Sequence, residues 1–287
     1  MHPAASLIAF TTLSGAGFGL LAFMGLGLGV SRGWAGAGLF ALGFGLALTG
    51  LAASTAHLGR PERAIKAFRE WRSSWLSREA WLALAALGTL TLFAALRLAN
   101  LPALPVGILG AALALFTVAA TAMIYAQLRT VPRWHHWSTP AIFLAHAVTA
   151  GTVLTGFRWP AIALLMATAL AQFVVWKTGD ARAAASPTTR ESATGLGPIG
   201  QVRPFEPPHT GNSYLTKEMV FVIGRKHAVK LRALALALAY LAPVGVLLIP
   251  PHIVTVAFAA ALHLGGTALT RWLFFAEAEH VLARYYR

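Results

Sequence analysis

The chain has 287 residues, of which 57% are hydrophobic and only 11% are charged, whereas an ordinary soluble domain has about 25% charged residues. This composition excludes a soluble globule. Because the chain has no cysteine, it can hold no disulfide, no thiolate-bound iron–sulfur cluster and no covalently attached c-type haem. The formal net charge of +14 comes from 23 Lys and Arg against 9 Asp and Glu. In a membrane protein such an excess usually marks topology, so we expect no nucleic-acid partner.

Eight apolar stretches are each long enough to cross about 30 Å of hydrocarbon as a helix. They run from Ala4 to Val30, Ala35 to Leu58, Glu79 to Leu98, Pro105 to Leu128, Pro140 to Phe157, Pro160 to Trp176, Leu231 to Ile249 and Ile253 to Phe275. The first stretch carries no Lys or Arg before Arg32, so we expect a retained span rather than a cleaved signal peptide. The pattern predicts an all-α, polytopic membrane protein in which residues 1–287 form a single membrane domain, a bundle of eight transmembrane helices.

Glycines recur in the first two spans, among them Gly15, Gly17, Gly19 and Gly43. Small residues at helical spacing let transmembrane helices approach closely, and this packing replaces the hydrophobic drive that lipid removes. The glycines therefore predict tight helix packing rather than a channel filter.

The basic residues are distributed very unequally between the two sides of the predicted bundle. Twenty of the 23 Lys and Arg fall on the side that carries both termini and the even-numbered loops, and only Arg32, Arg97 and Arg158 fall on the other. By the positive-inside rule, this count predicts that both termini and the long loops are cytoplasmic. A basic surface that docks an acidic subunit would give the same count.

The longest loop, residues 178–229, joins the sixth and the seventh span and is rich in Pro, Gly, Ser, Thr and Arg. It has no periodic apolar pattern. Such a segment is either solvated or laid as an extended arm on a partner. If it is an arm, Arg203 is a candidate docking residue.

Polar chemistry is concentrated at the predicted cytoplasmic ends of the spans. His57 lies at the end of the second span, before a basic stretch over residues 62–75 that could lie along the membrane surface. A histidine at this depth can donate a ring N–H to a quinone carbonyl, and quinone reduction also takes up protons. Glu79 and Glu70 are the nearest carboxylates in sequence and are candidate proton relays. Glu79 could equally be a favourable charge at a helix N-terminus.

Two further segments on the same side carry candidate ligands. The loop over residues 130–140 holds Trp134, His135 and His136, although interfacial Trp and His usually serve as anchors. Arg271 lies within the last span, where a charge tends to face the protein interior, unless it reaches out to the interface. The candidate docking residues for a partner subunit are Arg69, Arg72, His135, His136 and Arg203.

Several short motifs resemble those of the anchor subunits of dimethyl sulfoxide reductases, the DmsC family. The motifs are His-Leu-Gly-Arg-Pro at 57–61, Leu-Ser-Arg-Glu at 76–79 and Thr-Val-Pro-Arg-Trp at 130–134. The opening residues, with Phe-Thr-Thr-Leu-Ser-Gly-Ala-Gly at 10–17, resemble the branch that includes the anchors of cytoplasmic sulfite dehydrogenases. The resemblance covers the first five spans well and the last three loosely.

The resemblance implies eight helices in a bacterial inner membrane, a bound quinone (ubiquinone or menaquinone) and no haem. It implies two partners, a four-cluster iron–sulfur subunit and a molybdopterin catalytic subunit, which would hold all other cofactors. It also implies that His57 and Glu79 belong to the quinone site. Together with the residue-level reasoning, the expected quinone-binding set is His57, Arg60, Arg63, Glu79, Trp134 and Arg271.

The basic, histidine-rich side departs from the pattern of exported reductases, because the charge count predicts that it is cytoplasmic. We therefore expect electrons to pass from sulfite oxidation on a partner to quinone. Alternatives are the anchor of an S-oxide reductase that oxidises quinol, a b-haem cytochrome anchor using His146 and His263, and a secondary transporter. In either quinone-linked interpretation this chain itself carries no substrate chemistry.

Overall fold

The computed structural model describes residues 2–29, 32–56, 61–203, 205–206, 227–250, 252–281 and 283, with only the backbone for residues 61–64. All regular elements of this part of the chain are helical. Seven of them are long and apolar enough to cross a membrane: α1 (Ala5–Gly25), α2 (Gly33–Thr55), α3 (Trp75–Leu98), α4 (Leu104–Ala126), α6 (Arg158–Ala184), the segment Ala228–Leu247 and α11 (Ile253–Ala276). The chain is thus an all-α, multi-pass membrane protein, as predicted.

The predicted fifth span is the exception in length. It corresponds to α5 (Ser138–Leu154), an apolar helix of 17 residues. At about 1.5 Å per residue it is about 26 Å long, somewhat short of an average hydrocarbon core. Seven helices of the described residues therefore have the length and composition of a full span, and the predicted count of eight rests on α5.

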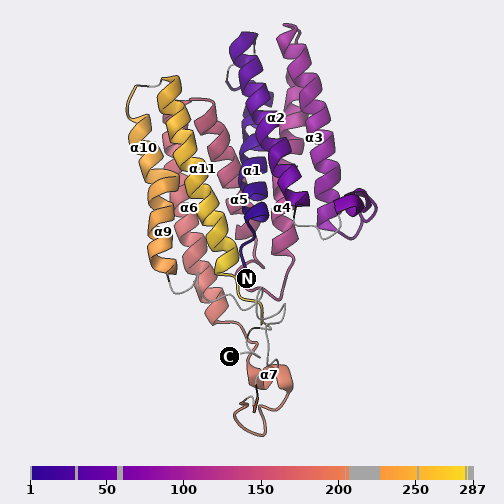
Figure 1. Cartoon of the computed structure of the whole chain (residues 1–287), viewed down its shortest axis with the longest axis vertical. Coiled ribbons are helices and arrows are strands. Elements are labelled where there is room, and N and C mark those ends of the chain that lie inside the picture. Colours follow the sequence, from indigo (N-terminus) through magenta and orange to yellow (C-terminus); the bar gives the residue numbers. More distant parts are fainter. Residues whose placement is uncertain are drawn as a thin grey trace.

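The helices form two groups that lie side by side (Figure 1). One group holds α1, α2, α3 and α4. The other holds α5, α6, α11 and the span built from α9 (Ala228–Leu236), η3 (Ala237–Leu241) and α10 (Ala242–Leu247). Helix α1 packs against α2, α4 and α5 and also contacts α11, so it joins the two groups.

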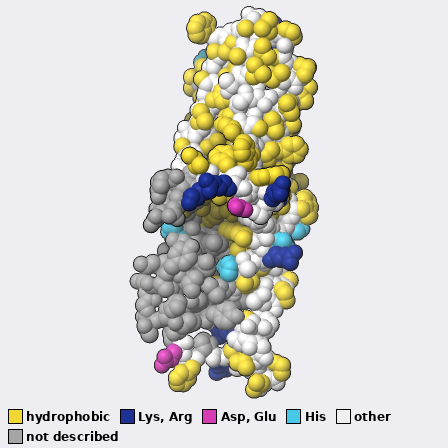
Figure 2. Space-filling model, turned by 90° about the vertical axis from the view of Figure 1, so that its right-hand side faces the viewer, with side chains coloured by type: hydrophobic (Ala, Val, Ile, Leu, Met, Phe, Trp, Pro, Cys, Tyr) yellow, Lys and Arg dark blue, Asp and Glu magenta, His cyan; other side chains and the backbone are white. Residues whose placement is uncertain are grey.

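The same end of both groups carries the non-spanning elements, and we call it the lower end (Figure 1). The short helices η1 (Pro61–Phe68) and α7 (Arg190–Thr194) lie there, together with the loop over residues 127–137. On the face drawn in Figure 2, hydrophobic side chains dominate the upper part and Lys and Arg side chains cross the middle. This pattern fits a bundle whose upper part is surrounded by lipid.

Glycines of α1 bring its backbone against three neighbouring helices. A Cβ added at Gly19 would collide with the carbonyl of Ala147 in α5, and one added at Gly17 would collide with the backbone of Ala47 in α2. Gly25 lies equally close to the backbone of α4, where a Cβ would meet a carbonyl oxygen at 2.5 Å. The close packing that the glycine spacing predicts is confirmed.

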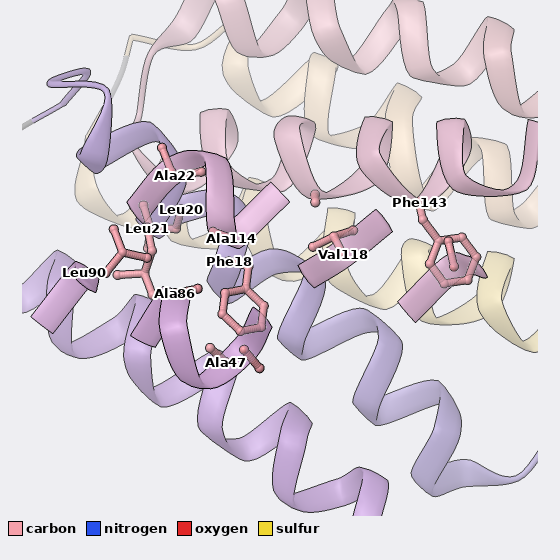
Figure 3. Close-up of a cluster of buried hydrophobic side chains, with 14 of the residues drawn as sticks. Phe18, Leu20, Leu21, Ala22, Ala47, Ala86, Leu90, Ala114, Val118 and Phe143 are labelled. Atoms are coloured by element: carbon pink, nitrogen blue, oxygen red, sulfur yellow. The ribbon is translucent and has the colours of Figure 1, made fainter. Parts of the chain in front are cut away.

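The core of the first group is built around the middle of α1 (Figure 3). There, Phe18, Leu20 and Leu21 pack among residues of α2, α3 and α4, including Ala47 and Leu90. Each of these side chains is almost fully buried. Because lipid is as apolar as these residues, their contribution comes from close van der Waals packing rather than from removal from water.

The seventh predicted span is interrupted by a π-helical turn, η3. Pro243 follows it and has no backbone N–H, so it cannot donate to the carbonyl of Ala239 one turn earlier. That carbonyl instead accepts a hydrogen bond from Nδ1 of His263 in α11 (2.7 Å). The turn also carries Tyr240, whose hydroxyl hydrogen bonds with Nε2 of His146 in α5 (2.6 Å). The irregular turn therefore ties the seventh span to α5 and α11.

Candidate functional site

Glu79 is a buried carboxyl in the second turn of α3, near the lower end. Its residue is only 4% exposed, and Oγ1 of Thr121 in α4 donates a hydrogen bond to its Oε1. Helix α3 begins at Trp75 and has no acidic residue in its first turn. Glu79 therefore forms its hydrogen bond with the neighbouring helix α4 and does not cap the free N–H groups at the start of α3. A carboxyl held inside a membrane bundle is costly and is by default a candidate for function.

Tyr125 lies one turn below Thr121 on α4, and sequence reasoning missed it. Its phenol interacts electrostatically with both Glu79 and Arg271. Its ring packs against Trp134 at a centroid distance of 5.3 Å and against three phenylalanines of α5 and α11. The structure thus brings Glu79, Trp134 and Arg271 of the expected quinone-binding set together around Tyr125.

Arg271 and Trp134 are both buried and both face the protein. The Arg271 residue is 3% exposed, and its guanidinium carbon lies 3.4 Å from the ring centroid of Phe143. In the described part of the chain no carboxylate forms an ion pair with it. Trp134 stacks on Phe274 and donates its indole N–H to the Phe274 carbonyl (3.0 Å). The interior position predicted for Arg271 is confirmed, whereas Trp134 is a buried residue and not an interfacial anchor.

A narrow cleft, here called the outer cleft, lies between α5, α6 and α11. Its cavity volume is about 40 Å³, room for a few water molecules. Residues that line it include Trp134, Gln172, Thr270, Arg271 and Glu277. Because Arg271 and Trp134 line it together, the outer cleft gives the buried cluster a polar connection toward the lower end.

An ion-pair cluster of four side chains lies beside the outer cleft. Arg232 of α9 donates to both oxygens of Asp180 in α6 (2.7 and 2.8 Å) and to both oxygens of Glu277 after α11 (2.8 and 2.7 Å). Arg133, from the loop before α5, donates to Asp180 as well. The cluster therefore holds the lower ends of α6, α9 and α11 and that loop together. Sequence reasoning missed this ion-pair cluster. The chain has only nine acidic residues, so Asp180 and Glu277, near the ends of two spans, could have indicated it.

A second feature is an open aromatic groove at the start of α3, with a volume of about 560 Å³. Its lining consists of Phe68, Trp71, Trp75, Arg78, Trp81 and Leu82. Arg78 lies over the Trp75 ring and donates to the carbonyl of Trp71 (3.0 Å), while the Trp81 indole donates to the carbonyl of Phe68 (3.0 Å). These bonds fix the turn after η1 against α3. The groove adjoins the turn that carries Glu79.

Three of the expected site residues lie where the structure gives no side-chain position. His57 and Arg60 are outside the described residues, and only the backbone of Arg63 is described, within η1. Glu70 is exposed, and the contact of its carboxylate is with the hydroxyl of Ser73 (3.2 Å). A relay from Glu70 to Glu79 therefore stays a prediction.

The expected docking residues lie at the lower end with different degrees of exposure. Arg69, Arg72, His135 and Arg203 are exposed, whereas His136 is half-buried. Burial, together with the neighbouring Arg182 and His135, lowers the pKa of His136 below its ordinary value of 6.5. His136 is therefore less suited to docking by charge than the exposed Arg69, Arg72 and Arg203.

The two histidines of the haem alternative are held by hydrogen bonds within the second group of helices. His146 Nε2 bonds with the hydroxyl of Tyr240, and His263 Nδ1 bonds with the carbonyl of Ala239. The ring of Tyr240 is 6.1 Å from that of His146 and 6.2 Å from that of His263. Both imidazoles therefore contact the π-helical turn. Among the described residues, no group of three or more His, Cys, Asp or Glu could hold a metal ion.

Comparisons with known proteins agree with the motifs. The model of the family described as "DMSO reductase anchor subunit (DmsC)" matches residues 1–176. The C subunit of the sulfite dehydrogenase of Allochromatium vinosum is 33% identical, over an alignment that covers 100% of this chain and 99% of that protein. No solved structure matches the chain at a significant level. The family match includes α1 to α5 and most of α6, and thus Glu79, Tyr125 and Trp134, while Arg271 lies beyond it.

Proposed function

Because the chain belongs to the family of DMSO reductase anchor subunits, we propose that it carries electrons between an iron–sulfur subunit and the quinone pool. The iron–sulfur subunit holds four clusters and delivers electrons from a molybdopterin catalytic subunit. The anchor itself supplies the quinone site and its protons. The partners hold the clusters and the molybdopterin, and this chain binds neither these nor haem.

The observation that carries the proposal is the buried carboxyl of Glu79, in a turn of α3 that also contributes Arg78 and Leu82 to the aromatic groove. Reduction of a quinone to a quinol takes two electrons from the iron–sulfur partner and two protons from protein groups or water. In this proposal Glu79 transfers a proton at the lower end; its hydrogen bond from Thr121 and its electrostatic influence on Tyr125 support this role. The groove is large enough for an aromatic ring and is open on one side, which suits a head group that enters while its tail stays in the membrane.

The remaining members of the site act on the ring. His57 donates a hydrogen bond to one carbonyl oxygen, and Arg60 and Arg63 lie in the same segment. Trp134 packs against Tyr125, and Arg271 acts electrostatically on the same phenol, so both belong to the inner side of the site.

The charge count and the similarity to a known protein support a topology and a substrate. We propose that the lower end, both termini and the extrinsic subunits lie in the cytoplasm of a bacterium, with α5 as the eighth crossing; the excess of Lys and Arg at this end supports that orientation. Similarity to the sulfite dehydrogenase protein favours electron flow from sulfite to quinone. The anchor of an S-oxide reductase would pass electrons in the opposite direction, from quinol to the iron–sulfur subunit. A phosphatase fusion at Arg287 that is active in the periplasm would contradict this orientation.

The proposal is tested by Glu79→Gln in the assembled complex, with quinone-linked and dye-linked sulfite oxidation measured in parallel. Quinone-linked turnover should fall about 100-fold, the lower range for loss of a proton-transfer group, while dye-linked turnover stays unchanged. Thr121→Val should lower it less, and Thr117→Val serves as control because its hydroxyl bonds to the carbonyl of Leu113 in its own helix. Full quinone-linked turnover in an assembled Glu79→Gln complex would refute the role of Glu79.

A further inference from the structure

A second, smaller cavity lies deeper in the bundle, between α1, α5 and α11, and we call it the inner cavity. Its volume is about 10 Å³, close to the minimum for one water molecule. Thr12, Gly15, His146, Thr267 and Arg271 are among the residues that line it. Arg271 lines the outer cleft as well, so its side chain separates the two spaces.

Four buried polar atoms around the inner cavity have no hydrogen-bond partner among the described residues. They are Oγ1 of Thr12, Nδ1 of His146, Oγ1 of Thr267 and Nε of Arg271. All four belong to residues that line the cavity and are at most 5% exposed. Buried polar groups are nearly always paired, so four unpaired atoms at one cavity indicate a polar ligand.

The two threonines are unusual within this molecule. The other buried threonines all have a hydrogen-bond partner: most donate to a backbone carbonyl, as Thr117 does to that of Leu113 (2.8 Å), and Thr149 pairs with Thr168 (2.7 Å). Thr12 and Thr267 form no such bond. Their hydroxyl groups are therefore available to a ligand in the cavity.

The set of four atoms matches the bonding capacity of one water molecule. Nε of Arg271 can only donate, and the two hydroxyl groups can donate or accept. Nε2 of His146 is engaged with Tyr240, which leaves Nδ1 for the cavity. Water accepts two hydrogen bonds and donates two, and buried waters make two to four. Chloride could only accept, and it is larger than the water-sized space.

We propose that the inner cavity binds one ordered water molecule that joins α1, α5 and α11 and positions Arg271. The water satisfies Nε, so that the guanidinium stays stacked on Phe143 at the inner end of the outer cleft. It also extends the Tyr240–His146 hydrogen bond to α1, across the boundary between the two helix groups. The inner cavity shares Arg271 with the proposed quinone site, but its tests measure stability and electron density, so they do not depend on quinone activity.

A substitution at Gly15 tests the proposal, because it should lower the stability of a protein whose cavity holds water and raise the stability of one whose cavity is dry. Gly15 is buried and lines the inner cavity, yet a Cβ added there meets no atom within 4 Å. The methyl group of Gly15→Ala would therefore enter the cavity and displace the water. The control is Gly45→Ala in α2, where an added Cβ also meets nothing within 4 Å but faces outward. Both substitutions gain the same helix propensity.

We expect the apparent melting temperature of Gly15→Ala to lie about 2–4 °C or more below that of Gly45→Ala. Thr267→Val should lower the apparent melting temperature by a similar amount relative to its control, Thr117→Val. Since both act on one water, the double variant Gly15→Ala/Thr267→Val should lose less than the sum of the single losses. A Gly15→Ala protein that melts at or above the control would mean that a dry void is filled, and would overturn the proposal.

Crystals of the purified protein grown with bromide in place of chloride give the direct test. The expected result is a density peak within hydrogen-bond distance of the four atoms and without anomalous scattering. A bromide signal at that position would assign the site to an anion, and the absence of any peak would leave it dry. Either of these results would overturn the proposal.

Discussion

Replacing Arg232 with Gln should destabilise the membrane domain strongly. Arg232 donates four hydrogen bonds to Asp180 and Glu277, and the Glu277 side chain is only 5% exposed. Removing one partner of a buried ion pair costs about 3–5 kcal/mol, because the other charge is left buried. The Asp180 side chain is 39% exposed and can be solvated. We therefore expect a loss of about 3 kcal/mol, the smallest value of this range. At about 2–4 °C per kcal/mol, the apparent melting temperature should fall by roughly 6–12 °C.

The assay is thermal unfolding of the detergent-solubilised protein at a fixed scan rate, since membrane proteins often unfold irreversibly. Lys230→Gln is the matched control, because Lys230 is exposed on the same helix and its loss changes the net charge equally. The double variant Arg232→Gln/Glu277→Gln should be more stable than Arg232→Gln alone, because it also removes the buried Glu277 carboxylate, whose remaining ion-pair partner would be Arg133 at 3.9 Å. If Arg232→Gln melts no lower than Lys230→Gln, the cluster does not hold the helix ends together.

Three further outcomes are expected. Gly19→Ala should destabilise the protein by about 1–3 kcal/mol, because its methyl group meets the Ala147 carbonyl. The control is Gly38→Ala in α2, which has open space around it and should not destabilise the protein. Equal melting temperatures of the two variants would exclude the close approach of α1 and α5. Tyr125→Phe should slow quinone-linked turnover several-fold and leave dye-linked turnover intact; an unchanged quinone-linked rate would remove Tyr125 from the site. Residues 185–227 should be protected from protease only when the extrinsic subunits are bound, and equal cleavage without them would identify a plain solvated loop.

The sequence predicts the helices well but not where they end. Apolar stretches mark the hydrocarbon thickness, whereas helices continue past it when their polar residues find partners. The third span starts at Trp75 instead of Glu79, so that Glu79 falls inside the helix and not at its N-terminus. The sixth continues from Trp176 to Ala184, which makes residues 178–184 of the predicted long loop helical and brings Asp180 to Arg232.

The candidate site is only partly visible in the sequence, for a related reason. Arg271 stands out because a charge within an apolar stretch is costly, and Glu79 because it is a carboxylate at a span end close to His57 in sequence. Tyr125 and Thr121 give no such signal, because one aromatic and one small polar residue are ordinary in a transmembrane helix. Their importance depends on which helix faces α3, and this is a tertiary property. The same holds for Tyr240, which the π-helical turn directs toward His146.

The central claim is that this chain connects the extrinsic subunits to quinone. It is tested most directly by comparing quinone-linked with dye-linked sulfite oxidation in purified complexes that contain or lack the chain. We predict similar dye-linked rates in both, and quinone reduction only when the chain is present. Equal quinone reduction by the extrinsic subunits alone, or none by the full complex, would contradict the account.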